Sequence, residues 1–291
     1  MAFELFAPER PEEASQLLRD QDPERVAVLA GGTDLLFDLG DGRARPARVV
    51  SLRRLPWATW AWHGPDLEIG STLPLSRLEA DRSVRERVPG LWSAVHAVGG
   101  IALRHRATLG GNLARASPAS DLLPILMALN AQVRLFSIEG RREFPVDQFV
   151  KSSRKTALKP GELIESVRLP DAGPSEYLWQ RVRPANDISQ VGVAVAVAPT
   201  APIWRVALGG ISPRPRRIPE AEKRLPSRFP SELEIELAAQ EAAQRAPFLT
   251  DKRASEAYRR RLVSVLVRRA VRAVVEQLGR RSATAPGGPA T

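Results

Sequence analysis

The stretch Arg104–Pro124, which reads RHRATLGGNLARASPASDLLP, contains the strongest signal of fold and function in this 291-residue chain. It combines the hydroxyl of Thr108, the glycine pair Gly110–Gly111, the amide side chain of Asn112 and an acid, Asp121, before an apolar segment. Paired glycines lack Cβ atoms, so a ligand can approach their backbone N–H groups closely. Such N–H groups, particularly near the start of a helix, bind phosphate oxygens well. The stretch therefore indicates a loop that binds a phosphorylated ligand.

A second glycine pair lies far earlier in the chain. The segment Ala30–Leu35 reads AGGTDL and follows the apolar run Val26–Leu29. Neither pair has the GxGxxG spacing of a Rossmann fold or the pattern of a Walker loop. Taken alone, each pair also fits a plain turn, and Asp121 also fits a carboxylate that only stabilises a helix start. Together the two loops can hold the two halves of a diphosphate, which indicates a dinucleotide.

Composition limits what these loops can belong to. The apolar fraction of 43% is ample for the two or three compact units expected of this length. The chain has no cysteine, which excludes disulfides, thiol catalysis and cysteine-ligated iron–sulfur clusters within it. Its start resembles no secretory signal, and no apolar run is long enough to span a membrane. We therefore expect a cytoplasmic protein without a membrane span.

The formal net charge of +10 is concentrated near the C-terminus. Residues 251–281 contain nine Arg and one Lys against three acidic residues. We interpret this segment as one helix whose arginines, Arg259 among them, lie on a solvated or subunit-facing surface. No helix-turn-helix or RRM pattern accompanies it, so we expect no nucleic-acid partner. The apolar side chains expected to face the core are Tyr258, Leu262, Val265, Leu266 and Val274.

The chain offers no set of residues typical of catalysis or metal binding. Its three histidines, His63, His96 and His105, are not spaced as metal ligands and are not accompanied by a cluster of acids. We also identify no side chain that would act as general base or nucleophile. A cofactor that only relays electrons needs neither, because the redox chemistry belongs to the cofactor. We therefore expect no catalytic residue and no metal ion in this chain.

Hydrophobic patterning predicts an α+β fold of three units and a tail. Residues 1–54 and 55–172 form two α/β units, residues 173–281 form a C-terminal α+β domain with a three-stranded sheet, and residues 282–291 are disordered. The strands expected in the first two units are Val26–Ala30, which we expect to be buried, Arg48–Leu52, Leu67–Gly70, Val133–Phe136, Arg141–Phe144 and Leu163–Leu169. The expected helices are Pro11–Arg19, a short one capped by Thr33 and closed by Gly40, one from Ser76, Leu91–Val98 and the buried Asp121–Leu129.

The pattern changes after Asp171–Pro174, which we interpret as a linker. Valines alternate with glycine and alanine over residues 191–197, as in a strand with one large-residue face and one small-residue face. Trp204–Ile211 is expected to pair with it. Residues 219–246 and 255–279 are expected to be helical. The C-terminal domain is therefore predicted as a small sheet covered by helices on one side.

Four stretches give the chain a resemblance to a known family. They are AGGTDLL at 30–36, RHRATLGGNLARASPASDLLP at 104–124, LGGISPRPRRIPEAEKRL at 208–225 and DKRASEAYRRRLVSVLVRRAV at 251–271. In this order they resemble the FAD-binding medium subunit of the molybdenum hydroxylases, the group of xanthine dehydrogenase and carbon monoxide dehydrogenase. The resemblance implies a vanillyl-alcohol-oxidase-like (PCMH-type) FAD-binding domain of two α/β subdomains, followed by a CO-dehydrogenase-flavoprotein-like C-terminal domain.

The resemblance also implies which residues bind FAD. The diphosphate-binding loops map onto Ala30–Leu35 and Thr108–Asn112, the ribose or adenosine contact onto Asp121, and the isoalloxazine surroundings onto Ile164 and Trp179. The sequence departs from the family at Arg104–His105, where relatives often have Arg-Asn, and at Trp179, where they often have lysine. The full expected set is Leu29, Ala30, Gly31, Gly32, Thr33, Asp34, Leu35, Val98, Thr108, Leu109, Gly110, Gly111, Asn112, Ser117, Asp121, Ile164 and Trp179.

The resemblance finally implies partners and a reaction. A large subunit would hold the molybdopterin cofactor, a small subunit two [2Fe-2S] clusters, and the complex would be a dimer of heterotrimers. FAD in this chain would take electrons from the clusters and pass them to an external acceptor, NAD or a quinone. Three alternatives stay open: a self-contained PCMH-type flavin oxidoreductase, a nucleotide-binding regulatory module, and a basic nucleic-acid or scaffold protein that rests on the arginine-rich helix.

Overall fold

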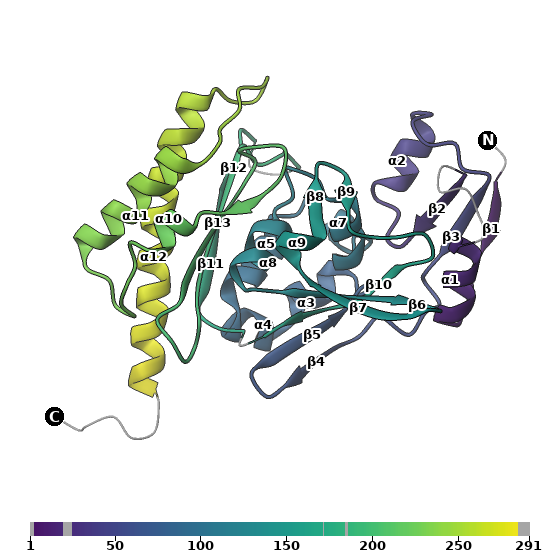
Figure 1. Cartoon of the computed structure of the whole chain (residues 1–291), viewed down its shortest axis with the longest axis horizontal. Coiled ribbons are helices and arrows are strands. Elements are labelled where there is room, and N and C mark those ends of the chain that lie inside the picture. The colour runs from purple at the N-terminus through teal and green to yellow at the C-terminus, as the bar shows by residue number, and fades with distance from the viewer. Residues whose placement is uncertain (1–2, 20–24, 171, 184–185, 285–291) are drawn as a thin grey trace.

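The computed structural model describes residues 3–19, 25–170, 172–183 and 186–284. The fold is α+β, as predicted, and is built on three main sheets that lie in a row with their covering helices (Figure 1). The N-terminal unit lies at one end and the C-terminal domain at the other. The largest sheet lies between them, so the middle unit contacts both of its neighbours.

The N-terminal unit is a three-stranded parallel sheet in the order β1–β3–β2. Its strands are β1 (Glu4–Phe6), β2 (Val26–Leu29) and β3 (Arg48–Ser51), and its helices are α1 (Pro11–Arg19) and α2 (Leu35–Gly40). Helix α1 packs Ala14 and Leu18 against Val50 and against residues of the middle unit. The buried strand expected here is wrong, because β2 is an edge strand and Val28 is 41% exposed. Thr33 does not cap α2, which has Asp34 at that position.

The middle unit is built on an antiparallel five-stranded sheet in the order β4–β5–β10–β6–β7. These strands are β4 (Trp60–His63), β5 (Asp66–Gly70), β6 (Gln132–Ser137), β7 (Gly140–Pro145) and β10 (Leu163–Leu169), with a small ribbon of β8 (Val150–Ser152) and β9 (Lys155–Thr156). The expected hairpin of β6 and β7 is confirmed. Strands β1 and β4 were not predicted, because neither has a long alternating pattern. Strand β10 carries an irregularity in register between Ile164 and Ser166.

Helices cover one face of this sheet and form the main core. They are α3 (Leu75–Ala80), α4 (Arg82–Arg87), α5 (Pro89–Ala97), α6 (Ile101–Arg104), α7 (Leu109–Arg115), α8 (Leu122–Ala128) and α9 (Val146–Phe149). Every residue of α8 is buried, as expected of the apolar segment after Asp121. The other face of the sheet carries charged side chains that pair across strands, such as Glu68 with Arg134 and Glu143 with Arg168. The core therefore lies on one side of the sheet, as is common in antiparallel sheets.

The C-terminal domain has a four-stranded sheet in the order β11–β12–β13–β14, one short strand more than predicted. The strands are β11 (Ser175–Gln180), β12 (Val191–Val197), β13 (Trp204–Gly209) and β14 (Arg216–Arg217). The two faces predicted for β12 are confirmed, because its valines and its alanines lie in different cores. The domain's own helices pack on the valine face of β12, as predicted for one side of the sheet, and α8 of the middle unit packs against β12 and β13. The alanine face leaves room for this close approach.

Three helices complete the C-terminal domain: α10 (Pro219–Glu222), α11 (Glu232–Arg245) and α12 (Glu256–Thr284). The single helix expected over 219–246 is interrupted, and α11 starts afresh at the capping box of Ser231 and Glu234. Helix α12 runs through residues 282–284, which we expected to be disordered; residues 285–291 lie outside the described part. Within the described residues, no helix has both the length and the apolar character needed to cross a bilayer.

Two further expectations about the C-terminal part are wrong. Tyr258 is 43% exposed and does not face the core, whereas Arg259, expected on the surface, is 2% exposed. Leu266 and Val274 are buried as predicted, and so are Val263, Val267 and Val271, which we did not name. The segment Ala172–Pro174, interpreted above as part of a linker, is buried, and Asp171 lies outside the described residues.

Candidate functional site

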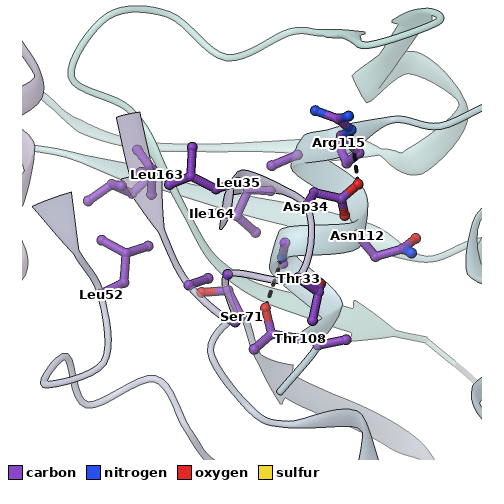
Figure 2. Close-up of a pocket in the computed structure, with 18 of the residues that line it drawn as sticks. Thr33, Asp34, Leu35, Leu52, Ser71, Thr108, Asn112, Arg115, Leu163 and Ile164 are labelled. Atoms are coloured by element: carbon purple, nitrogen blue, oxygen red, sulfur yellow. Dashed lines mark hydrogen bonds and ion pairs between the residues drawn. The ribbon is translucent and has the colours of Figure 1, made fainter. Parts of the chain in front are cut away.

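A cavity of about 400 Å³ lies between the N-terminal unit and the middle unit. Both glycine segments line it, although they are far apart in sequence (Figure 2). The expected residues that line it are Ala30, Gly31, Gly32, Thr33, Asp34, Leu35, Val98, Thr108, Gly110, Gly111, Asn112 and Ile164. Its volume is within the range of ligand pockets in proteins. The structure therefore brings most of the predicted site into one concave surface.

The two glycine segments touch each other directly. A Cβ atom on Gly31 would lie 2.0 Å from the carbonyl oxygen of Arg106, which is too close for any side chain. A Cβ atom on Gly111 would lie 3.9 Å from the Cβ of Ala30. The floor of the cavity is thus formed by two backbones in contact, and glycine at position 31 is what permits that contact.

The first segment presents backbone N–H groups that the protein does not use. Gly32 has a φ of +80°, a left-handed conformation that glycine adopts without strain. Among the described residues, the N–H groups of residues 31–35 donate no hydrogen bond within the protein. They precede α2 and lie at the cavity, where successive N–H groups form a concave surface for an anion.

The second segment differs from the loop that we expected, because Gly110 and Gly111 belong to helix α7. Thr108 caps this helix, and its Oγ1 accepts a hydrogen bond from Gly111 N at 3.0 Å. Gly110 N donates to the carbonyl oxygen of Ser71, also at 3.0 Å. Both N–H groups are therefore occupied by the protein. The glycines serve close packing here, since a Cβ on Gly110 would lie 2.5 Å from the Cβ of Ser71.

Charged groups cluster at one end of the cavity. Arg115 of α7 reaches across to the N-terminal unit, where its Nε lies 3.1 Å from Asp34 Oδ1 and its Nη1 lies 2.6 Å from Asp38 Oδ2 (Figure 2 shows the first pair). The hydrogen bond from Arg115 lowers the pKa of Asp38 more than burial raises it. Glu162, the other acid on the lining, pairs with Arg142 at 2.7 Å. Each acid of the lining is thus paired with an arginine.

Apolar side chains line other parts of the cavity. They come from all along the first two units and are Val28, Leu35, Leu52, Val98, Leu103, Leu158, Leu163 and Ile164. The irregularity in β10 falls at Ile164, and such a bulge changes the direction in which a side chain points. A cavity with apolar walls and a few polar groups is typical of a site for a flat organic ligand.

Five expected residues do not line the cavity: Leu29, Leu109, Ser117, Asp121 and Trp179. Leu109 is fully buried in the main core. Trp179 stacks on Tyr177, with 5.8 Å between the ring centroids, and the Arg181 guanidinium lies over the Trp179 ring, 5.3 Å from its centroid. Ser117 contacts its own turn, since its Oγ accepts a hydrogen bond from Ala119 N at 3.3 Å.

Asp121 is buried at the seam between the middle unit and the C-terminal domain. Its Oδ1 accepts hydrogen bonds from Tyr177 Oη at 2.7 Å and from Ser189 Oγ at 2.6 Å. Burial raises the pKa of this carboxyl, and the two hydroxyl donors oppose that shift only in part. In this structure Asp121, at the start of α8, joins that helix to Tyr177 of β11 and to Ser189 in the segment before β12, and it does not line the cavity.

The cavity also contains residues that we did not predict. They are Val28, Asp38, Leu52, Ser71, Leu103, Ala107, Ala114, Arg115, Leu158, Glu162 and Leu163. Ala114 and Arg115 lie one helical turn after Gly111, so a helical interpretation of the second segment would have found them. Leu52, Ser71 and Leu163 lie at or just beyond the ends of strands, and no local pattern marks them.

Models of two protein families match the chain. The family described as FAD binding domain in molybdopterin dehydrogenase matches residues 1–172, and the CO dehydrogenase flavoprotein C-terminal domain matches residues 176–274. The first of these matches defines the class of the chain as an FAD-binding protein. More narrowly, the chain belongs to the family of FAD-binding subunits of molybdenum hydroxylases, which are oxidoreductases.

Individual relatives agree with this membership. The chain is 28% identical to the glyceraldehyde dehydrogenase medium chain of Sulfolobus acidocaldarius, over 94% of this chain and 98% of the relative. It is 30% identical to the nicotinate dehydrogenase FAD-subunit of Eubacterium barkeri, over 67% and 68%. Among solved structures, a chain of carbon monoxide dehydrogenase from Hydrogenophaga pseudoflava superposes with a TM-score of 0.87 at 25% identity, covering 95% of this chain and 98% of that one.

Proposed function

We propose that the cavity between the first two units holds FAD and that Gly31–Leu35 binds its diphosphate. The single observation that carries this proposal is the row of backbone N–H groups at residues 31–35, which have no acceptor among the described residues and lie at the cavity. Charged phosphate oxygens are the acceptors that such groups suit best. The second glycine segment contributes space, because Gly111 has no side chain to enter the cavity.

The remaining lining residues fit the other parts of the cofactor. Ile164 and Leu163 offer apolar surface to a ring system, whereas Thr33 and Asn112 offer hydrogen bonds to hydroxyl groups. Arg115 keeps Asp34 and Asp38 from presenting uncompensated negative charge to the diphosphate. When bound, FAD accepts electrons singly or in pairs, which no side chain of this chain can do. The chain's residues bind and orient the cofactor and keep water from it.

We also propose that this subunit relays electrons within a larger complex. Two electrons removed from a substrate in a large molybdenum-cofactor subunit would reach this chain one at a time through two [2Fe-2S] clusters of a small subunit. The same two electrons would leave together to NAD⁺ or a quinone. Relatives named medium chain or FAD-subunit support the view that partner subunits exist. A dimer of heterotrimers is the assembly that we propose.

Titration with FAD tests the binding proposal. We expect one FAD per full-length chain, and we expect Gly111→Asp to lose flavin retention because it places bulk and a negative charge in the cavity. Gly279→Asp is the matched control, since Gly279 lies on α12 with no neighbour within 4 Å and far from the cavity. A Gly111→Asp protein that purifies with a full complement of flavin would show that the assignment is wrong.

The electron path is tested on the complex purified from its native host. We expect two further subunits, one rich in cysteine, to copurify in equal amounts with this chain. After reduction of the complex by dithionite and removal of excess reductant, mixing with NAD⁺ or with menadione should reoxidise the flavin in one of the two cases. Flavin that stays reduced with both acceptors would contradict the proposed exit of electrons.

A further inference from the structure

One hydroxyl group on the cavity wall has no partner in the protein. Ser71 follows strand β5 and lines the cavity, yet the residue is only 3% exposed. Its Oγ makes no hydrogen bond to any described residue. Burial of an unpaired hydroxyl costs free energy, and buried polar groups in folded proteins nearly always have a partner. A buried, unpaired hydroxyl on a ligand cavity therefore indicates that the partner is the ligand.

The backbone holds Ser71 firmly in this position. Its N–H donates to the carbonyl oxygen of Glu165 at 3.0 Å, and its carbonyl oxygen accepts from Gly110 N at 3.0 Å. Gly110 lies so close that a Cβ atom there would be 2.5 Å from the Cβ of Ser71. Ser71 thus lies directly beside the glycine pair of α7, at the part of the cavity labelled with Thr108 in Figure 2. It can turn its hydroxyl toward the cavity but cannot move away from it.

The neighbouring residue, Thr72, provides a comparison for Ser71. Thr72 is also buried, at 8% exposure, and its Oγ1 also lacks a partner among the described residues. Thr72 does not line the cavity. The two adjacent residues therefore share the same unpaired buried hydroxyl and differ in whether a cavity ligand can reach it.

We propose that Ser71 is a further cofactor-binding residue, whose Oγ–H donates a hydrogen bond to an oxygen atom in the linker between the two ring systems of the dinucleotide. The inference rests on the proposed function, since it takes the ligand to be FAD. The linker is the part of the cofactor rich in oxygen acceptors, and the glycine pair beside Ser71 is where such a linker can pass close to the backbone. A serine hydroxyl at this position can donate a hydrogen bond to an oxygen atom of the ligand without adding a charge to the cavity wall.

The test compares Ser71→Ala with Thr72→Val in the full-length chain. FAD affinity is measured by titration, and the melting temperature is measured on protein stripped of flavin. We expect Ser71→Ala to weaken FAD binding about fivefold, the effect of one neutral hydrogen bond. We expect the flavin-free melting temperature to stay the same or rise in both variants, because each loses an unpaired buried hydroxyl. Thr72→Val should leave FAD affinity unchanged.

The outcomes separate this inference from the proposal on which it rests. Wild-type chain that binds no FAD contradicts the proposed function itself. Wild-type chain that binds FAD while Ser71→Ala binds it equally well overturns only the role of Ser71. A Ser71→Ala variant that loses affinity together with flavin-free stability, or a Thr72→Val variant that loses the same affinity, shows that the residue acts through the fold and also overturns the inference.

Discussion

Single residues in the cavity are constrained by contacts of a few atoms. Gly31 touches the backbone of Arg106, and Gly110 touches Ser71. There is therefore no space for a Cβ atom at either glycine. These are steric requirements that hold with or without a ligand. They differ from the electrostatic requirement at residues 31–35, whose free N–H groups matter only when an anion is present.

Gly31→Ala separates the two segments. Its new methyl group would lie 2.0 Å from a backbone oxygen that cannot rotate away, so the N-terminal unit must shift. Overpacking of this kind costs roughly 1–3 kcal/mol. We expect lower free energy of unfolding and at least tenfold weaker FAD binding. Gly40→Ala, with no atom near its Cβ, is the control and should preserve both. Equal FAD affinity in the two variants would show that the contact of the segments is dispensable.

Asp121 gives stability a pH dependence. Burial raises its pKa above the usual value of 3.8, so the folded state binds this proton more tightly than the unfolded chain does. Its contribution is complete below pH 3.8 and is lost as pH rises through the folded pKa. Asp121→Asn keeps an oxygen acceptor for Tyr177 and Ser189 and removes the buried charge. Chemical denaturation at several pH values should show the variant gaining stability over wild type as pH rises. A constant difference would contradict this account.

Some residue roles were predictable from the chain and others were not. Thr108 and the two glycine pairs could be identified as site residues only in combination, because each glycine pair alone also fits a plain turn. Asp121 could not be placed, because its partners, Tyr177 and Ser189, come from the next domain. A carboxylate before a helix looks the same in sequence whether it faces a ligand or a domain seam.

Two arginines join pairs of elements, although the sequence pattern does not show whether they are buried or exposed. Arg115 joins α7 to α2 through Asp34 and Asp38, and it bridges the two units that form the cavity. Arg259 joins the start of α12 to the sheet, where its Nη1 donates to the carbonyl oxygens of Gln190 and Gly210. Its Nη2 lies 2.5 Å from Asp251 Oδ1. Both arginines look like surface residues until their partners are known.

Arg115→Ala removes the bridge between α7 and α2. Hydrogen bonds to a charged group contribute roughly 1.5–3 kcal/mol, so the free energy of unfolding should fall by about 2 kcal/mol. FAD binding should weaken at least tenfold, because Asp34 and Asp38 would then repel the diphosphate. Arg82→Ala also removes one positive charge but from an exposed pair outside the cavity, and it should change neither quantity. Calorimetry and FAD titration measure the two effects. If the two variants had equal affinity, the bridge would be irrelevant to binding.

Arg259→Met tests the corrected view of α12. The change removes the donor to two carbonyl oxygens and the charged partner of Asp251 inside the C-terminal domain, which should cost roughly 3 kcal/mol. Arg261→Met is the control, because Arg261 is exposed on the same helix. We expect a clear drop in melting temperature for the first variant only. Equal melting temperatures would mean that Arg259 behaves as the surface residue that its sequence suggested.

Helix and strand positions followed well from periodicity where the elements are long. The hairpin of β6 and β7, the two-faced strand β12 and the buried helix α8 all have clear patterns. Helix α7 was misread as a loop because Gly110 and Gly111 lower helix propensity, whereas in the structure the cap at Thr108 and packing against Ser71 stabilise it. At this part of the cavity wall, tertiary contacts therefore outweigh the low helix propensity of the two glycines.

At the scale of the whole molecule, three units share two seams. The cavity lies in the first seam, and the alanine face of β12 packs on α8 in the second. Leu52, Ser71 and Leu163 meet at the cavity from three separate segments, which no pattern in the sequence could show. Family membership, by contrast, could be predicted from four stretches, because each stretch is a continuous run of residues that can be recognised without knowing the fold.

The most direct test is a structure of the full-length chain with FAD bound. We predict that the diphosphate lies against the N–H groups of residues 31–35, beside Gly111, and that no large shift of the two units is needed. A cofactor bound elsewhere, or a diphosphate that makes no contact with residues 31–35, would contradict the central claim.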